Sequence, residues 1–368
     1  MKNITKIGVI GCGNICDIYF QNCKKLNNIE VIAAADLDIS RAKAKAEKYG
    51  FSRACSVDEI LADDEIDIIL NLTIPKAHAE IALRALGAGK HVYSEKPLAL
   101  NRKDGKAILD LAKSKGLLVG AAPDTFLGQG LQTCRKLIDD GVLGNIIAGN
   151  VFMMCPGHES WHPAPQFYYQ KGGGPMLDMG PYYLTALVNM LGPVKSVIGA
   201  AKITRETRTI TSQPFNGQQI KVEVPTHIAG ILNFVSGATI FITTSFDVCC
   251  HSMPPIELYG SKARLIAPDP NIFGGHVTIC SHAKCETQVS PVIGYPNNSR
   301  ALGLADMADA IKVGRQHRAS GDLAYHVLDI MLAINESSNI SAKIDIQSSV
   351  NRPATIGQKD INVLGMID

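Results

Sequence analysis

Two glycines near the start of the chain have the spacing that binds the pyrophosphate of a dinucleotide. They stand in the run Gly11-Cys12-Gly13-Asn14-Ile15-Cys16, between an apolar strand-like segment and a helical pattern. The first glycine permits a tight turn, the second lets the backbone approach a phosphate, and the helix start offers unpaired N–H groups to the anion. A small thiol takes the place of a third glycine, which serves helix–strand packing. The predicted cofactor contacts in this turn are Gly11, Gly13, Asn14 and Ile15.

Asp36 follows Gly13 at the distance expected for a residue that binds the adenosine ribose. It ends the second apolar run, 23 residues after Gly13. A carboxylate there accepts hydrogen bonds from the ribose hydroxyl groups and repels a 2′-phosphate. No arginine follows at once, since Leu37 comes next and Arg41 stands four residues further on. The sequence therefore predicts NAD as the cofactor in preference to NADP.

The elements that must position these residues alternate between strands and helices. Short apolar runs separated by helical patterns predict parallel strands joined by right-handed crossovers. We therefore expect residues 1–125 to form an α/β Rossmann domain with a doubly wound parallel sheet. The predicted strands are Ile7–Ile10, Glu30–Ala35, Asp67–Leu72, His91–Tyr93 and Leu117–Ala121, and the predicted helices include Ser40–Tyr49, Ala79–Ala88 and Arg102–Lys113.

After about residue 145 the pattern becomes richer in strands. It predicts that residues 126–368 form an α+β domain with a large, mainly antiparallel open sheet, and the last helix is a candidate to pack back on the first domain. A tight hairpin is expected at Val235-Ser236-Gly237. The predicted strands are Ile146–Met154, Val194–Ile203, Ile220–Val224, His227–Phe234 and Ala238–Phe246, and the predicted helices are Asp178–Leu191, Leu302–Val313 and Leu323–Ser338.

The composition excludes several classes of partner. A formal net charge of +2 gives no reason to expect binding to nucleic acid or to an anionic membrane. No apolar run approaches the length of about 18 residues that a membrane span needs, and the start of the chain lacks a signal-peptide pattern. We therefore expect a cytoplasmic protein whose ten cysteines are reduced. Cys280, His282 and Cys285 lack the fourth ligand of a structural zinc site, so no metal is predicted.

Three segments resemble the Gfo/Idh/MocA oxidoreductases, the family named for glucose-fructose oxidoreductase and inositol dehydrogenase. They are the turn at 11–16, the stretch from Thr73-Ile74-Pro75-Lys76-Ala77-His78 through Ala88-Gly89-Lys90-His91-Val92 to Glu95-Lys96-Pro97-Leu98-Ala99, and Gly172-Gly173-Gly174-Pro175-Met176-Leu177-Asp178-Met179-Gly180-Pro181-Tyr182. The resemblance implies an NAD-dependent oxidoreductase whose second domain carries the substrate on one face of its sheet and often a subunit contact on the other. A homodimer or homotetramer is expected. The further cofactor contacts that it implies are Thr73, Pro75, His78, Glu95, Lys96 and Pro97, with a peptide bond before Pro97 that is commonly cis.

The resemblance also implies the catalytic residues. Lys96 is expected beside both cofactor and substrate. Asp178 is expected to bind a substrate hydroxyl, although a plain helix N-cap would also explain an aspartate there. The family frequently has a histidine four residues later, where this chain has Tyr182. A tyrosine is a poorer base unless a cation lowers its pKa, so the base is either Tyr182 activated by Lys96 or Lys96 itself.

An aromatic stretch upstream of Asp178 is the best candidate for gripping a sugar ring. It contains the only tryptophan, Trp161, next to His162, which is a candidate for the missing imidazole. The alternative is a loop buried by its own aromatic residues. Asp124, after the last predicted Rossmann strand, is a further candidate for contact with cofactor or substrate.

The leading hypothesis is hydride transfer between NAD and a secondary alcohol of a sugar, an inositol or a sugar derivative. Two alternatives remain open at this point. The first is a redox-neutral enzyme that oxidises a glycoside transiently, cleaves or eliminates the aglycone, and returns the hydride to tightly held NAD. The second is a non-catalytic ligand sensor, which would not need to retain Lys96 and Asp178.

Overall fold

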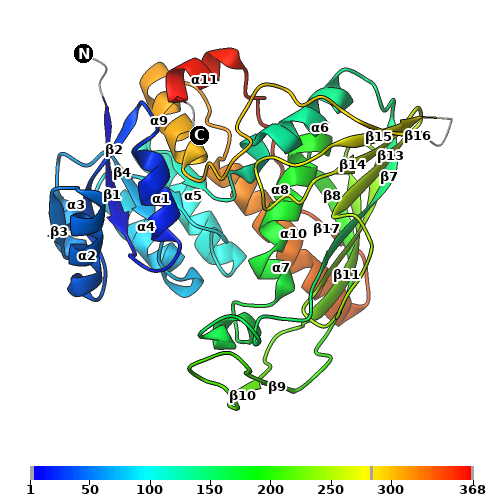
Figure 1. Cartoon of the computed structure of the whole chain (residues 1–368), viewed down its shortest axis with the longest axis horizontal. Helices are drawn as coiled ribbons and strands as arrows, with labels where there is room; N and C mark the ends of the chain where they lie inside the picture. The colour runs from blue at the N-terminus through cyan, green and yellow to red at the C-terminus, as the bar shows by residue number, and fades with distance from the viewer. Residues whose placement is uncertain (1–3, 282–284, 366–368) are drawn as a thin grey trace.

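The first part of the chain is a parallel sheet whose strands alternate with helices, as the sequence predicts (Figure 1). The computed structural model describes residues 4–281 and 285–365. The strands follow the order β3-β2-β1-β4-β5-β6, which is the doubly wound order of a Rossmann fold. Their bounds are β1 (Thr5–Ile10), β2 (Ile29–Ala35), β3 (Arg53–Cys55), β4 (Ile68–Asn71), β5 (His91–Ser94) and β6 (Val119–Ala121).

Local capping fixes the helices that join these strands. Asp38 accepts a hydrogen bond from the Ser40 N–H at the start of α2, and Ser56 with Glu59 forms a capping box at the start of α3. The helices predicted from Ser40, Ala79 and Arg102 are α2, α4 and α5, whereas α3 and the short strand β3 were not predicted. The bounds are α1 (Cys16–Cys23), α2 (Ile39–Tyr49), α3 (Val57–Ala62), α4 (His78–Gly87) and α5 (Arg102–Lys115).

The second part contains the predicted open sheet. The order of its described strands is β16-β15-β14-β13-β7-β12-β11-β8-β17, and every neighbouring pair is antiparallel except β7 with β12. The expected hairpin joins β11 to β12. The bounds are β7 (Ile146–Met154), β8 (Val194–Lys202), β11 (His227–Phe234), β12 (Thr239–Ser245), β13 (Ile256–Gly260), β14 (Arg264–Ala267), β15 (Thr278–Ser281), β16 (Cys285–Gln288) and β17 (Ile344–Asp345).

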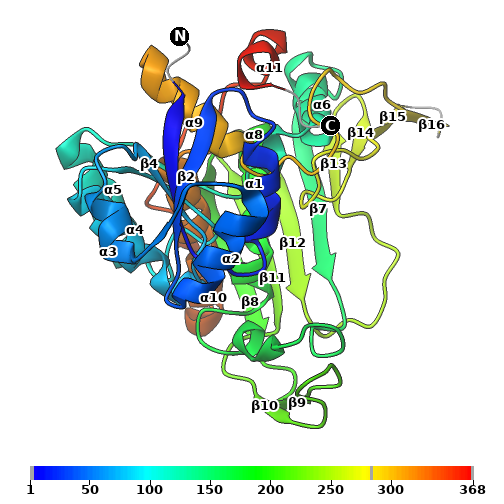
Figure 2. The same ribbon diagram turned by 60° about the vertical axis from the view of Figure 1, so that its left-hand side comes forward.

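The predicted strand Ile220–Val224 does not join this sheet. Gln219–Lys221 forms the short strand β10, which pairs with β9 (Thr207–Thr209) in a separate ribbon that extends away from the sheet (Figure 2). Ile220 is its one buried residue, so the segment is too short and too exposed to compete for a place in the sheet.

The cysteines whose side chains are described all carry free thiols. Cys16, at the third position of the glycine turn, is buried in the core, as a packing residue should be. Cys280 lies in β15 and is half-buried, while His282 and the side chain of Cys285 lie outside the described residues. Within the described ranges, no three His, Cys, Asp or Glu side chains are grouped as metal ligands would be.

One helix of the second part differs from its prediction. The sequence predicts one helix over Asp178–Leu191, but residues 175–191 form two helices separated at Met179, because Pro175 and Pro181 each stand in the first turn of a new helix. Asp178 therefore ends a short helix and does not cap a long one. None of the described helices has the length and apolar character needed to cross a membrane. The bounds are α6 (Gln129–Asp139), α7 (Pro175–Asp178), α8 (Gly180–Leu191), α9 (Leu302–Val313), α10 (Gly321–Ile340) and α11 (Gln358–Leu364).

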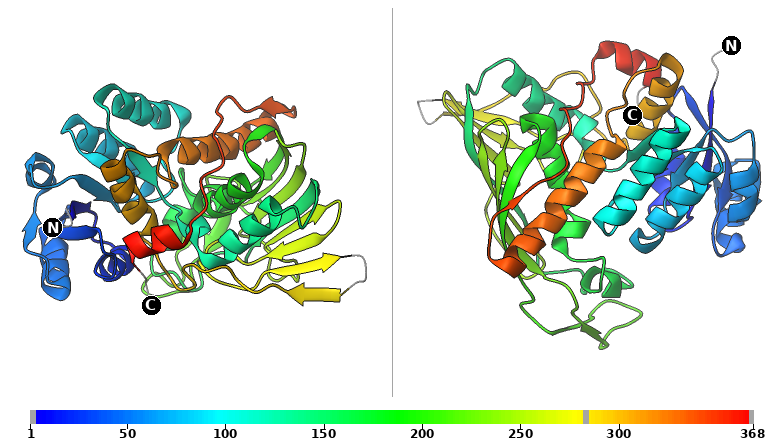
Figure 3. Two further views of the ribbon diagram at one scale, coloured as in Figure 1. Left: turned by 90° about the horizontal axis from the view of Figure 1, so that it is seen from above. Right: turned by 180° about the vertical axis from the view of Figure 1, so that it is seen from behind.

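Helix α10 joins the two parts of the molecule. It packs against β8 on the inner face of the second sheet and lies beside α5 of the first part (Figure 3). The approach to β8 is close at Gly199, where an added Cβ atom would lie 2.1 Å from the carbonyl oxygen of Ile334. The absence of a side chain at Gly199 thus sets the distance between helix and sheet.

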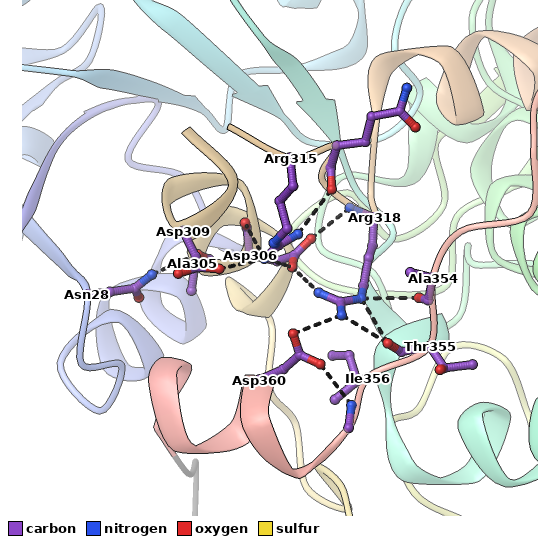
Figure 4. Close-up of polar contacts among 12 residues, drawn as sticks. Asn28, Ala305, Asp306, Asp309, Arg315, Arg318, Ala354, Thr355, Ile356 and Asp360 are labelled. Atoms are coloured by element: carbon purple, nitrogen blue, oxygen red, sulfur yellow. Dashed lines mark hydrogen bonds and ion pairs between the residues drawn. The ribbon is translucent and has the colours of Figure 1, made fainter. Parts of the chain in front are cut away.

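A buried ionic network fixes α9 to the C-terminal segment (Figure 4). The carboxylate of Asp306 is fully buried and pairs with Arg315 and Arg318, and the Arg318 backbone N–H also donates to it at 2.7 Å. Arg318 donates in turn to the carbonyl oxygen of Thr355 at 2.9 Å and pairs with Asp360 in α11 at 2.8 Å. Because each charge has a partner, the network can be buried without an isolated ion.

The contact at Gly199 predicts a difference between two paired glycines. Gly230 is the cross-strand partner of Gly199, but an added Cβ there meets no atom nearer than 3.4 Å. Gly199→Ala should therefore lower the free energy of unfolding by about 1–3 kcal/mol, because the methyl group would overlap α10, whereas Gly230→Ala should cost less. Urea unfolding of the two variants checks this, and an equal loss in both would contradict the packing described.

Candidate active site

The predicted cofactor contacts lie together at one edge of the first sheet. The last residues of β1, β4, β5 and β6 pair with one another across the sheet, so these four strands end side by side. The segments that follow them, 11–16, 72–78, 95–97 and 122–124, therefore meet at this edge. In open α/β sheets a dinucleotide binds outside the carboxyl ends of the strands, where the strand order reverses between the first and fourth strands.

The glycine turn has the shape of a phosphate cradle. Gly11 has φ of +105°, and an added Cβ would lie 2.6 Å from the backbone of Leu72, so only glycine fits. Space is open beside Gly13. Among the described residues, the backbone N–H groups of Gly13, Asn14 and Ile15 have no acceptor, and they precede the first turn of α1. Free N–H groups at a helix start bind anions, so the turn fits a pyrophosphate.

Asp36 and three apolar side chains complete this cradle. The half-buried Asp36 carboxylate accepts a hydrogen bond from the Cys12 N–H at 2.7 Å, which holds it beside the turn. Ile15, Leu37 and Ile74 are large apolar residues that are nevertheless exposed. They follow β1, β2 and β4, which are neighbours in the sheet, and such a surface suits the flat face of an adenine ring.

Two buried side chains hold the segments around the cradle in place. The ring nitrogens of His78 lie 2.7 Å from the carbonyl oxygen of Pro97 and 2.9 Å from that of Thr73. Glu95 accepts a hydrogen bond from the Tyr19 hydroxyl at 2.7 Å. Both side chains are enclosed, so we describe His78 and Glu95 as positioning residues. Pro75, also a predicted contact, begins a 3₁₀ turn, Pro75–Ala77, directly before His78.

Lys96 and Asp178 meet between the two parts of the molecule. The Lys96–Pro97 peptide bond is cis, as the resemblance implies. The Lys96 Nζ atom donates to the Asp178 carbonyl oxygen at 2.6 Å and to its carboxylate Oδ1 at 2.7 Å. Burial lowers the pKa of Lys96, but Asp178, Tyr182 and Glu95 together raise it more, so the net pKa lies above the usual value. Burial likewise raises the pKa of Asp178, yet Lys96 and His158 together lower it to about 2.

Tyr182 lies beside this pair with a second cation near it. Lys96 Nζ is 5.3 Å from the centre of the Tyr182 ring, and the positive charges of Lys96 and Arg300 both act to lower the pKa of the Tyr182 phenol. Burial raises the pKa of Tyr182, and the two cations only partly offset that rise. At neutral pH the site therefore holds an ammonium group, a carboxylate and a neutral phenol.

Arg300 reaches the site because of a strained turn before α9. The next residue, Ala301, is fully buried and has φ of +88°, a conformation unusual for a residue with a side chain. The Asp124 carboxylate accepts hydrogen bonds from the N–H groups of Ala301 and Gly303, both at 3.0 Å. Asp124 is 1% exposed and turned toward α9, so it positions this turn and does not face an open site.

The aromatic loop places His158, and not His162, near Asp178. His158 Nε2 lies 3.8 Å from Asp178 Oδ2, whereas His162 Nδ1 accepts a hydrogen bond from the Ala164 N–H within its own loop. Trp161 is exposed and packs edge-on against the His158 ring. The loop is thus partly buried by its own aromatic residues, with His158 on its inner side.

Arg300 and His158 are the two residues of this site that the sequence did not single out. Arg300 stands 118 residues after Tyr182, in a segment without a motif. His158 could have been found, because it belongs to the same run as Trp161 and His162, but its side-chain direction depends on the packing of the whole loop.

Two family models match the chain, one in each part of the fold. The model described as "Oxidoreductase family, NAD-binding Rossmann fold" matches residues 5–122, and the "GFO/IDH/MocA C-terminal domain" matches residues 131–266. The chain belongs to the Gfo/Idh/MocA oxidoreductase family. Membership confirms the resemblance seen in the sequence and the two-part fold that it implies.

Several relatives of this Gfo/Idh/MocA protein act on sugars or inositol by name. It is 23% identical to the D-glucoside 3-dehydrogenase of Escherichia coli K12, over 93% of this chain and 97% of that one. It is 25% identical to the myo-inositol 2-dehydrogenase of Thermotoga maritima, over 71% and 75%. Its fold matches levoglucosan dehydrogenase in complex with NADH and L-sorbose with a TM-score of 0.80, at 19% identity and over 94% and 99% of the two chains.

Proposed function

We propose that this protein transfers a hydride between NAD and a secondary alcohol of a sugar, an inositol or a sugar derivative, with Lys96, Asp178 and Tyr182 at the reaction centre. The observation that carries the proposal is the contact between Lys96 Nζ and the Asp178 carboxylate at the cofactor edge of the first sheet. An ammonium group held there can stabilise an alkoxide-like oxygen. The names of the two dehydrogenase relatives support a ring alcohol as the substrate class.

Different residues of the cradle would bind different parts of NAD. The free N–H groups of Gly13, Asn14 and Ile15 would hold the pyrophosphate, and Asp36 would accept hydrogen bonds from the adenosine ribose. The nicotinamide supplies the carbon that accepts or gives the hydride when the cofactor is bound. Glu95 and His78 keep the Lys96 turn in position at the same edge.

The protonation states of Lys96 and Tyr182 in the free protein decide which of them can donate or accept the proton of the substrate. In reduction of a ketone, Lys96 donates a proton from its ammonium group to the carbonyl oxygen. In oxidation of an alcohol, either Lys96 or Tyr182 must first lose its own proton before it accepts the proton of the hydroxyl group. Asp178 orients Lys96 in both the reduction and the oxidation. Arg300 and Lys96 stabilise Tyr182 when it is ionised.

Cofactor choice depends on Asp36. Calorimetry should show tighter binding of NAD than of NADP, because the 2′-phosphate would meet the carboxylate as a like charge. Asp36→Ser should narrow the ratio of the two dissociation constants by about tenfold. Asp64, an exposed carboxylate in the segment before β4, provides the control, since Asp64→Ser should leave the ratio unchanged. Tighter binding of NADP by the unmodified protein would show that the assignment is wrong.

The role of Lys96 is tested by turnover with NAD and a panel of alcohols that includes methyl β-D-glucopyranoside and myo-inositol. Formation of NADH by the unmodified protein supports net oxidation. Lys96→Met should lower kcat by ~100- to ~10,000-fold and change the affinity for NAD little, because the lysine acts on the transferred proton. Lys103→Met, an exposed position on α5, is the control. Near-normal turnover in Lys96→Met would overturn the proposed reaction centre.

The Tyr182→Phe variant and the pH profile separate the two candidate bases. If Tyr182 is the base, Tyr182→Phe should lower kcat almost as much as Lys96→Met does. The kcat of the double variant should then be little lower than that of either single variant. If Tyr182 positions the substrate, the change should appear mainly in KM. In both cases oxidation should accelerate as the pH rises above neutrality, because the raised pKa values of Lys96 and Tyr182 leave little base at neutral pH.

We also propose that the outer face of the second sheet forms the contact between subunits of a homodimer or homotetramer. Ile198, Ile231 and Phe241 are opposite one another on β8, β11 and β12 and form an apolar row on the side away from α10. Ile198 is 42% exposed and Phe241 49%. Light scattering should give the mass of an oligomer, and Phe241→Asp should reduce it. Val313→Asp, at an exposed apolar position on α9, is the control, and a monomeric unmodified protein would contradict the proposal.

A further inference from the structure

The imidazole ring of His158 is buried, and its nitrogen atoms are unsatisfied. His158 is 9% exposed, and neither Nδ1 nor Nε2 has a hydrogen-bond partner among the described residues. Buried polar atoms in native proteins almost always have a partner, and those that lack one need an explanation. A ligand group that is bound during function is one such explanation.

The surroundings of His158 prevent the ring from turning toward another partner. Tyr168, Phe246 and Trp161 pack around it, with ring centres 4.1, 4.5 and 5.3 Å away. The His158 backbone N–H donates to the Tyr169 hydroxyl at 3.0 Å. The ring therefore stays directed at the site even though it makes no hydrogen bond there.

The base of the loop is held just as firmly. The buried Arg208 guanidinium pairs with Glu159, the residue next to His158, and with Asp247. It also donates to the carbonyl oxygens of Pro156 at 3.0 Å and Phe246 at 2.7 Å. These contacts anchor the chain on both sides of the His158 ring.

One carboxylate oxygen of Asp178 faces the His158 ring. Its Oδ1 atom accepts from Lys96 at 2.7 Å, while Oδ2 faces His158 Nε2 at 3.8 Å. That separation is too long for a direct hydrogen bond. A hydroxyl oxygen near both atoms could accept from the imidazole N–H and donate to the carboxylate, which would satisfy both groups.

We propose that His158 and Asp178 Oδ2 together bind the hydroxyl group on the ring carbon next to the one that reacts at Lys96. The two oxygens of one carboxylate are adjacent, as are hydroxyl groups on neighbouring ring carbons. Asp178 can therefore hold Lys96 at the reacting carbon through Oδ1 and bind the neighbouring hydroxyl group through Oδ2. The site then selects cyclic vicinal polyols over alcohols with a single hydroxyl group. This inference rests on the proposed function for the position of the reacting carbon.

The test compares binding of methyl β-D-glucopyranoside with that of its 2-deoxy and 4-deoxy analogues. Calorimetry on the protein saturated with NADH measures affinity without turnover. The unmodified protein should bind at least one deoxy analogue about tenfold or more weakly than the parent glucoside, because that analogue leaves His158 and Asp178 Oδ2 unpaired. A protein that binds all three equally, or that does not bind the parent glucoside, would contradict the proposal.

Variants then assign the discrimination to His158. His158→Phe keeps an aromatic ring among its neighbours and should narrow the difference in affinity between the parent and the deoxy analogue, because only Asp178 Oδ2 still binds the hydroxyl group. His158→Gln, which retains an N–H donor, should keep more of that difference. His162→Phe, in the same loop, should leave the ratio of the affinities for the parent glucoside and the deoxy analogue unchanged. Discrimination that is as large in both His158 variants as in the unmodified protein would overturn the assignment.

Turnover of the same glucosides separates this inference from the proposed function. Loss of discrimination in His158→Phe with no NADH formed from any alcohol would support the binding site and refute the oxidation. If NADH forms but the His158 variants do not change the ratio of the affinities for the parent glucoside and the deoxy analogue, the oxidation is supported and the binding site is refuted.

Discussion

An ammonium group at the end of β5 and a carboxylate at the end of α7 meet where little of either side chain reaches solvent, and neither charge is stable there alone. The Lys96 and Asp178 side chains are 16% and 19% exposed. Removal of one partner from a buried pair destabilises a protein by roughly 3–5 kcal/mol, because the other charge stays uncompensated. The two parts of the chain must therefore approach closely and reproducibly. The close packing of α10 at Gly199 and the ionic network of Asp306 provide that constraint.

The same pair organises the chemistry of the site. Asp178 holds Lys96 as an ammonium group through Oδ1 and leaves Oδ2 directed toward His158. Tyr182, one turn further along the chain, is placed by the start of α8 beside Lys96, and Arg300 reaches it from the turn before α9. In the proposed mechanism, protonation, substrate orientation and specificity all depend on this one carboxylate, on which elements from distant parts of the sequence converge.

Local patterns in the sequence predicted the elements, whereas long-range packing decided which side chains face the site. The strands of the first sheet except β3, and the glycine turn, could be predicted because periodicity and glycine spacing act within a few residues. The break at Met179 depends on Pro181, which begins a new helix inside an otherwise continuous helical pattern. The roles of Arg300 and Asp124 were not accessible, since a contact between the end of β6 and the start of α9 spans 177 residues. His158 was distinguished from His162 only by the folding of the aromatic loop around Arg208.

A crystal structure of the protein with NADH and a non-reacting ring alcohol bound together would test the central claim most directly. The measurement is the position of the alcohol relative to the Lys96–Asp178 pair. We predict that one ring hydroxyl lies within hydrogen-bond distance of Lys96 Nζ while the pair remains intact, and that its carbon faces the nicotinamide. An alcohol bound elsewhere, with Lys96 and Asp178 paired only to each other and remote from both ligands, would contradict the account.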